Sequence, residues 1–110
     1  MYRILTEDVN RESIFAILDS HVDGYTVAPS IGAWKGRREN SLAIDLVDVP
    51  RGTVDAIAET IRAANKQESV LILEFPATAT FIRDRLRRTA SKDVARAQKR
   101  GNNDSNRTSN

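Results

Sequence analysis

The sequence predicts an α+β fold in which two helices cover one face of a four-stranded antiparallel sheet. Four runs have the alternating or continuous apolar pattern of strands, and two stretches have the three- and four-residue apolar spacing of helices. The elements follow one another in the order β-α-β-β-α-β within the first 76 residues of a 110-residue chain. That order is the split βαβ, or ferredoxin-like, arrangement.

The first two elements are a strand and a helix. Residues 2–6 alternate between two faces, as the side chains of a strand do. A helix is expected after Asp8 or Asn10, either of which suits its N-cap. Apolar residues at helical spacing then predict one buried face, made of Ile14, Ile17, Leu18 and either His21 or Val22.

The second and third strands are expected at residues 25–30 and 41–49, with a loop of about ten residues between them. Pro29 predicts that the second strand ends there or lies at a sheet edge, because proline has no amide hydrogen to donate. In the third strand Leu42, Ile44 and Leu46 share one face, which predicts the side that meets the core.

The remaining elements are a helix and a strand. A turn at residues 50–52 precedes the helix, with Thr53 as its expected N-cap and Asn65 as its expected end. The predicted buried face of this helix consists of Val54, Ile57, Ala58, Ile61 and Ala64. Residues 70–75 are apolar on both faces, which predicts an inner strand of the sheet.

Composition divides the chain into a ferredoxin-like domain in residues 1–76, a basic helical extension in 77–100 with its helix at about 80–99, and a disordered tail in 101–110. Residues 1–76 hold 8 Lys/Arg and 12 Asp/Glu, whereas 77–110 hold 9 Lys/Arg and 3 Asp. A basic tail can bind nucleic acid. Because no aromatic residue follows Phe81, we favour a solvated helix and do not expect a nucleic-acid partner.

The composition also excludes several kinds of chemistry. There is no cysteine, so a disulfide framework, a thiolate metal site and a cysteine nucleophile are all excluded. A single histidine, His21, cannot build a multi-histidine metal site, and neither a metal nor a cofactor is expected. No secretory leader or membrane-spanning apolar run is apparent, which predicts a cytoplasmic protein with no membrane partner.

The loop expected between the second and third strands carries the most chemistry. Trp34 stands there beside Lys35, Arg37 and Arg38, and Gly32 permits a close approach to the backbone. The tryptophan ring can stack on a base or pack on a neighbouring subunit. The three cations can bind a carboxylate or phosphate, or they can simply be solvated.

Glu39 is the candidate catalytic carboxylate, because it stands where this loop enters the third strand. A carboxylate there can bind an amino group or a sulfonium, or act as a general base. The alternative is an ion pair with Arg37 or Arg38. Two other residues each have two alternative roles. Tyr25 lines the site or belongs to the core, and Gln67 contacts a ligand or caps a helix end.

The sheet face that the two helices leave uncovered is also informative. The last strand places Leu71, Leu73 and Phe75 on one side and Val70 and Ile72 on the other, so the uncovered face receives apolar side chains. Large exposed apolar patches mark contact sites. We therefore expect a homo-oligomer formed through this face, or a C-terminal segment that folds back over it.

Four stretches together resemble the PII-like superfamily: GYTV (24–27), GAWKG (32–36), RENSLAIDL (38–46) and ANKQESVLILE (64–74). The resemblance covers about residues 2–76. It implies a ferredoxin-like homotrimer that binds adenine nucleotides or other small ligands in clefts between subunits. The long flexible loop of the nitrogen-signalling members has no counterpart in this sequence.

Within that superfamily the sequence resembles the phage-encoded S-adenosylmethionine lyases, through Gly32, Trp34, Lys35, Glu39 and the stretch 65–71. The resemblance implies cleavage of S-adenosylmethionine to 5′-methylthioadenosine and homoserine lactone, with attack by the substrate's own carboxylate. It implies Glu39 as the catalytic residue and an adenosyl-binding site lined by Tyr25, Ala28, Ser30, Ile31, Gly32, Trp34, Lys35 and Gln67. Two interpretations compete: a non-catalytic PII-like sensor of an adenine nucleotide or small metabolite, and a nucleic-acid-binding accessory protein.

Overall fold

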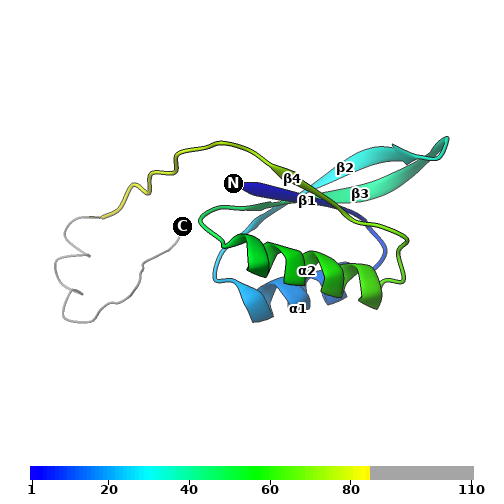
Figure 1. Cartoon of the computed structure of the whole chain (residues 1–110), viewed down its shortest axis with the longest axis horizontal. Helices are drawn as coiled ribbons and strands as arrows, with labels where there is room; N and C mark the ends of the chain where they lie inside the picture. Colours follow the sequence, from blue (N-terminus) through cyan, green and yellow to red (C-terminus); the bar gives the residue numbers. More distant parts are fainter. Residues whose placement is uncertain (85–110) are drawn as a thin grey trace. The chain divides into compact units, whose positions relative to one another are not determined.

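The computed structural model describes residues 1–84 of the chain, of which Met1–Ala79 form one compact unit. This unit contains β1 (Tyr2–Glu7), α1 (Arg11–His21), β2 (Thr26–Trp34), β3 (Arg37–Leu46), α2 (Arg51–Ala64) and β4 (Leu71–Glu74). The strands form one antiparallel sheet in the order β2-β3-β1-β4, and both helices lie against one face of it (Figure 1). The predicted α+β, ferredoxin-like arrangement is confirmed.

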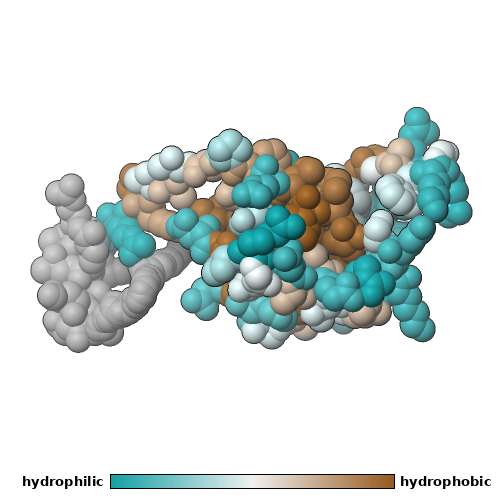
Figure 2. Space-filling view, in the orientation of Figure 1, coloured by the Kyte–Doolittle hydropathy of each residue, from teal (hydrophilic) through white to brown (hydrophobic). Residues whose placement is uncertain are grey.

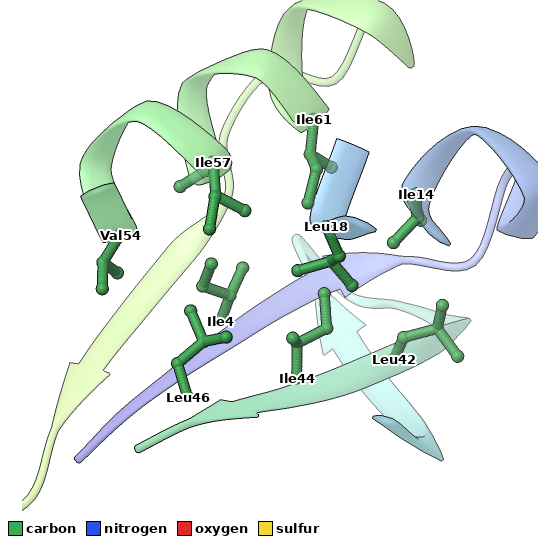
Figure 3. Close-up of a cluster of buried hydrophobic side chains, with 10 residues drawn as sticks. Ile4, Ile14, Leu18, Leu42, Ile44, Leu46, Val54, Ile57 and Ile61 are labelled. Carbon is green, nitrogen blue, oxygen red and sulfur yellow. The ribbon is translucent and has the colours of Figure 1, made fainter. Parts of the chain in front are cut away.

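The hydrophobic core fills the space between the sheet and the two helices. Figure 3 shows side chains from β1 and β3 pointing toward side chains from α1 and α2. Complete burial of an aliphatic side chain of this size contributes about 1.5–3 kcal/mol to stability. The nine residues that are fully buried here are Ile4, Ile14, Leu18, Leu42, Ile44, Leu46, Val54, Ile57 and Ile61.

Helix α1 begins after Asn10, one of the two residues predicted as its N-cap. The side chain of Asn10 accepts a hydrogen bond from the backbone amide of Ser13, at 3.1 Å, and so satisfies one of the free amides of the first turn. Ile14 and Leu18 are buried, and Ile17 and Val22 pack against the core from its margin. The predicted apolar face is therefore correct, with Val22 rather than His21 at its end.

Helix α2 begins three residues earlier than the sequence predicts. Pro50 is its N-cap, and the backbone amides of Thr53 and Val54 both donate to the Pro50 carbonyl oxygen, so Thr53 already lies inside the first turn. The prediction of Thr53 as the cap was wrong, because the φ of −63° at Pro50 already suits a helix entrance. Asn65 ends the helix as predicted.

The predicted loop of ten residues between β2 and β3 is wrong. The two strands stay paired from Thr26↔Asp45 to Trp34↔Arg37, which leaves only Lys35 and Gly36 in the turn. Both have positive φ, 52° and 78°, as a two-residue hairpin turn with the twist of the flanking strands requires. Pro29 does not end β2, because β2 is an edge strand and needs no amide donor there.

The last strand is an edge strand and not an inner one. In the sheet that residues 1–84 form, β4 pairs with β1 alone. Ile72 packs against the core, whereas Leu71 remains 53% exposed. The apolar character of residues 70–75 on both faces therefore reflects the core on one side and an uncovered sheet face on the other.

The C-terminal part of the chain was predicted to be a basic helix at about 80–99 followed by a disordered tail in 101–110. Residues 80–84 have no helical structure. The remainder of the predicted helix and the whole predicted tail lie outside the described residues, and the domain boundaries at 76 and 100 stay predictions. No helix in residues 1–84 combines the length and the apolar content that crossing a membrane requires.

Candidate functional site

Strand register decides which side chains share a face of the sheet. Leu42, Ile44 and Leu46 of β3 are buried against the helices, so the alternate residues of β3 and their partners in β2, β1 and β4 lie on the other face. We call this the open face. Its members are Arg3, Leu5 and Glu7 of β1, Thr26, Ala28, Ser30, Gly32 and Trp34 of β2, Arg37, Glu39, Ser41, Ala43 and Asp45 of β3, and Leu71 and Leu73 of β4.

Five of the nine predicted site residues lie together on the open face. They form two neighbouring rows: Ala28, Ser30, Gly32 and Trp34 follow one another along β2, and Glu39 stands in β3 directly opposite Gly32. Successive members of a row are about 7 Å apart, since side chains on one face of a strand repeat every second residue. The hairpin thus presents an aromatic ring, a bare backbone position and a carboxylate side by side.

Glu39 itself is half-buried at the base of the projecting hairpin. Among residues 1–84 its carboxylate has neither an ion pair nor a hydrogen bond to another side chain. The alternative that Glu39 pairs with Arg37 or Arg38 is therefore not realised in the described part of the chain. A carboxylate without an ion-pair partner leaves its oxygen lone pairs available to a cationic ligand.

Two open-face residues were not singled out by sequence reasoning. Ser41 Oγ lies 2.6 Å from Ser30 Oγ, and Glu7 stands in β1 directly opposite Ser41. Ser30 was expected at the site. Ser41 follows Glu39 on the same face of β3, whereas Glu7 becomes their neighbour only through the β1–β3 register. The alternation of β3 identifies Ser41 as a partner on the face of Glu39, but no local pattern connects either residue with Glu7.

The turn of the hairpin is tied to the turn between α2 and β4. Lys35 Nζ lies 3.0 Å from Glu68 Oε2 and 5.9 Å from the centre of the Trp34 ring. The hydrogen bond from Lys35, the charge of Lys35 and a smaller contribution from the Trp34 side chain lower the pKa of the Glu68 carboxyl. The ammonium group of Lys35, which was expected to bind a ligand, is thus matched by a carboxylate of the chain itself.

Tyr25 and Ile31 lie away from the open face. Tyr25 packs against the core, stacks on Phe15 with ring centres 6.5 Å apart, and donates a 2.6 Å hydrogen bond to Asp19. Burial and that carboxylate raise the pKa of Tyr25 to about 12. Ile31 has the register of the helix-side residues of β2 and is 74% exposed, because the hairpin projects beyond β1 at that point.

Gln67 is buried and connects two segments of the fold. Its amide nitrogen donates to Thr6 Oγ1 at 2.7 Å, and its carbonyl oxygen accepts from the backbone amide of Glu7 at 3.2 Å. Both ends of the side chain are therefore occupied by β1. This arrangement holds the α2–β4 turn against the end of β1, where Glu7 begins the acidic part of the open face.

The two arginines of the hairpin point to different faces. Arg37 pairs with Trp34 on the open face, and Arg38 pairs with Ala33 on the helix side. Both are exposed, and neither has an ion pair or hydrogen-bond partner among residues 1–84. Arg3, at the other end of the open face, is held by two hydrogen bonds to Asp45, at 2.6 and 3.1 Å.

The site therefore offers charge, an aromatic face and hydroxyl groups. In residues 1–84, no three histidine, cysteine, aspartate or glutamate side chains come close enough together to hold a metal ion. The side chains on the open face can bind a cationic group through Glu39 and Glu7, an anionic group through Arg37, and a flat or cationic group through Trp34. Such a set suits binding and orientation of a small charged molecule.

No protein-family model matches the chain, and no curated protein matches it. Among solved structures, the chain is similar to a phage SAM lyase in its apo state. The two are 22% identical, the alignment covers 64% of this chain and 74% of that chain, and the TM-score is 0.46. At this level of similarity the comparison assigns neither a family nor an activity.

Proposed function

We propose that this protein is a PII-like S-adenosylmethionine lyase, which cleaves its substrate to 5′-methylthioadenosine and homoserine lactone at the subunit interfaces of a homotrimer. One observation carries the proposal: Glu39, which forms no ion pair in the described residues, shares the open face with Gly32, its partner across the hairpin, and with Trp34 of the next open-face pair. The sequence motifs at 32–36, 38–46 and 64–74 support the same activity.

The reaction needs no group beyond the substrate. One carboxylate oxygen of S-adenosylmethionine attacks the γ-carbon and forms the new C–O bond of the lactone. The bond from that carbon to the sulfonium sulfur breaks, and its electron pair stays on sulfur to give a neutral thioether. The products are 5′-methylthioadenosine and protonated homoserine lactone, so the net charge of +1 is conserved and no proton has to move.

Each open-face residue then has a binding or orienting role. Glu39 holds the α-ammonium group of the substrate, and Glu7 adds negative charge near the part of the substrate that carries the sulfonium. Trp34, which is 48% exposed, provides a ring on which adenine can stack or over which a sulfonium can rest. Gly32 leaves the space beside Glu39 free of a side chain.

Orientation is the main catalytic effect that such a site can provide. The extended substrate must bend so that its carboxylate meets its own γ-carbon, and holding that conformation lowers the entropic part of the barrier. A dry site strengthens the effect, because water would stabilise the separated charges of the ground state. These requirements agree with a binding surface of carboxylates, hydroxyls and one aromatic ring.

A second copy of the chain would supply the enclosure. Leu5, Ala43, Leu71 and Leu73 form the apolar part of the open face, next to the proposed site. Figure 2 shows apolar surface in brown over the strands above the helix layer and hydrophilic surface around the hairpin turn. Burying this apolar part against sister subunits would bring the site to the edge of the interface, where a neighbouring chain can close it.

The test is to incubate the purified protein with S-adenosylmethionine and to separate the products by chromatography. We expect 5′-methylthioadenosine and homoserine lactone in equal amounts, and we expect Glu39→Gln to lower kcat/KM about ten- to hundredfold, the worth of one hydrogen bond between charged groups. Glu12→Gln is the matched control, since it removes the same charge from α1, on the other side of the sheet.

Two results would overturn the proposal. Binding of S-adenosylmethionine without any product would indicate the sensor of an adenine nucleotide or small metabolite instead. A Glu39→Gln variant with the activity of the Glu12→Gln control would remove Glu39 from the mechanism. The oligomer is tested separately by sedimentation, where we expect a trimer that Leu71→Asp dissociates.

A further inference from the structure

The charged groups of the open face differ in whether another side chain of the described residues is their ion-pair partner. Of the two arginines in the open-face set, Arg3 is held by Asp45, and Arg37 has no acidic partner in the described residues. Lys35, in the hairpin turn two positions before Arg37, has its Nζ 3.0 Å from Glu68 Oε2, and the neighbouring Arg38 lies on the other face of the sheet. Arg37 is thus the open-face cation whose charge no described carboxylate offsets.

Arg37 and Glu39 stand on the same face of β3 with one residue between them. Their Cα atoms are about 7 Å apart, as in any extended strand. A guanidinium and a carboxylate at that spacing, each without another charged partner in residues 1–84, can hold the two charges of an α-amino acid group between them.

From this geometry we propose that Arg37 binds the α-carboxylate of the ligand while Glu39 binds its α-ammonium group, so that the site selects adenosyl compounds that keep an intact amino-acid end. The inference rests on the proposed function and deepens it. Trp34 pairs with Arg37 across the hairpin and so lies beside it on the open face. Its ring would contact the adenosyl end or the sulfonium of the ligand.

In the reaction, the two oxygens of the substrate's carboxylate would then have different roles. A guanidinium binding one carboxylate oxygen fixes the direction of the other, which is the oxygen that attacks the γ-carbon. Arg37 is therefore a specificity-determining residue that also orients the attacking group. A nucleotide or nucleoside without the amino-acid end would lose this contact altogether.

The test compares two unreactive probes on three proteins. S-adenosylhomocysteine has the amino-acid end, and 5′-methylthioadenosine lacks it. We expect the wild-type protein to bind the first more tightly, Arg37→Gln to weaken it about ten- to hundredfold, and the affinity for 5′-methylthioadenosine to stay unchanged. Arg38→Gln is the matched control, because Arg38 is equally exposed and equally unpaired in residues 1–84 but lies on the other face.

The outcomes separate this inference from the proposed function. Selective loss of S-adenosylhomocysteine in Arg37→Gln supports the inference even where no turnover is found. Turnover with unchanged probe affinities in Arg37→Gln, or equal losses in Arg37→Gln and Arg38→Gln, overturns the inference and leaves the lyase proposal standing. Failure of the wild-type protein to bind any adenosyl compound overturns both.

Discussion

The hydroxyl groups of Ser30 and Ser41 lie 2.6 Å apart across the β2–β3 pair, on the face of the sheet that the helices do not cover. Ser41 is buried to 8% exposure although no helix packs over it. A Cβ atom added at Gly32 would stand 3.7 Å from Ser41 Oγ. The bare backbone at Gly32 therefore adjoins both the serine pair and Glu39, at the centre of the proposed site.

Gly32→Ala should change ligand affinity and protein stability in different ways. The added methyl group meets Ser41 Oγ at an ordinary contact distance and Gly32 does not have a positive φ, so the strand accepts alanine without strain. Because glycine is the more flexible residue in the unfolded chain, stability should stay equal or rise by about 0.4–1 kcal/mol. We expect binding of S-adenosylmethionine to weaken, because the methyl group projects onto the open face.

The measurement pairs thermal unfolding with calorimetric titration. Gly52→Ala is the control, since a Cβ there meets nothing within 4 Å and Gly52 lies in α2, on the opposite side of the sheet. A Gly32→Ala variant that binds as tightly as Gly52→Ala would mean that the ligand does not approach the backbone at this position.

Gln67→Leu should destabilise the protein without direct loss of a ligand contact. The substitution removes the acceptor of the Glu7 backbone amide and the donor to Thr6 Oγ1, which keeps only its 3.4 Å hydrogen bond to the Glu7 carbonyl oxygen, in a region of low exposure. An unsatisfied buried polar group costs about 1–3 kcal/mol, which chemical denaturation can resolve. Adding Thr6→Val removes the hydroxyl that has lost its Gln67 donor, so the double variant should lose less than the sum of the single variants.

The same experiment decides between the two roles considered for Gln67. If Gln67→Leu kept the free energy of unfolding and lost affinity for S-adenosylmethionine, the side chain would be a ligand contact after all. Equal affinity with reduced stability would assign it to the fold.

The core was predictable because it depends on local periodicity. Apolar residues at helical spacing in α1 and α2, and at alternate positions in β3, identified side chains that the structure buries. Ala64 is the exception: it was predicted on the buried face of α2, but at the last position of the helix it is exposed. Element ends were less predictable, since they depend on tertiary pairing. The β2–β3 hairpin stays paired for four residue pairs beyond Ser30↔Ser41, although glycine and charged residues in that stretch are typical of loops.

The candidate site was predictable in part for a related reason. Trp34 and Glu39 attracted attention through their chemistry, but the partner of each is set by register, a property of two strands together. Glu7 is separated from Ser41 by more than thirty positions in the chain and becomes its neighbour only through β1–β3 pairing. The resemblance placed Tyr25 and Ile31 at the site, whereas Tyr25 packs against the core and the pleat of β2 turns Ile31 to the helix side.

The last prediction concerns the tie between the hairpin turn and the α2–β4 turn. Trp34 is the one tryptophan in the chain, so tryptophan fluorescence, excited selectively over the two tyrosines, reports on this turn alone. The pKa of Glu68 lies below its ordinary value of 4.5, chiefly because Lys35 donates a hydrogen bond to the carboxylate. A lowered folded-state pKa means that the interaction is present above pH 4.5 and is lost as the pH falls through the lowered value.

An acid titration should therefore show a change in Trp34 fluorescence with its midpoint below pH 4.5, and added salt should weaken the tie because both side chains are exposed. Glu68→Gln should abolish the transition. Glu59→Gln is the control: the pKa of Glu59 is also lowered, by Arg62, but both residues of this pair lie on α2, and Glu59 forms no ion pair or hydrogen bond with the hairpin in residues 1–84. A transition that survives Glu68→Gln, or that disappears in Glu59→Gln, would show that Trp34 senses a different group and that the hairpin is not held through Lys35.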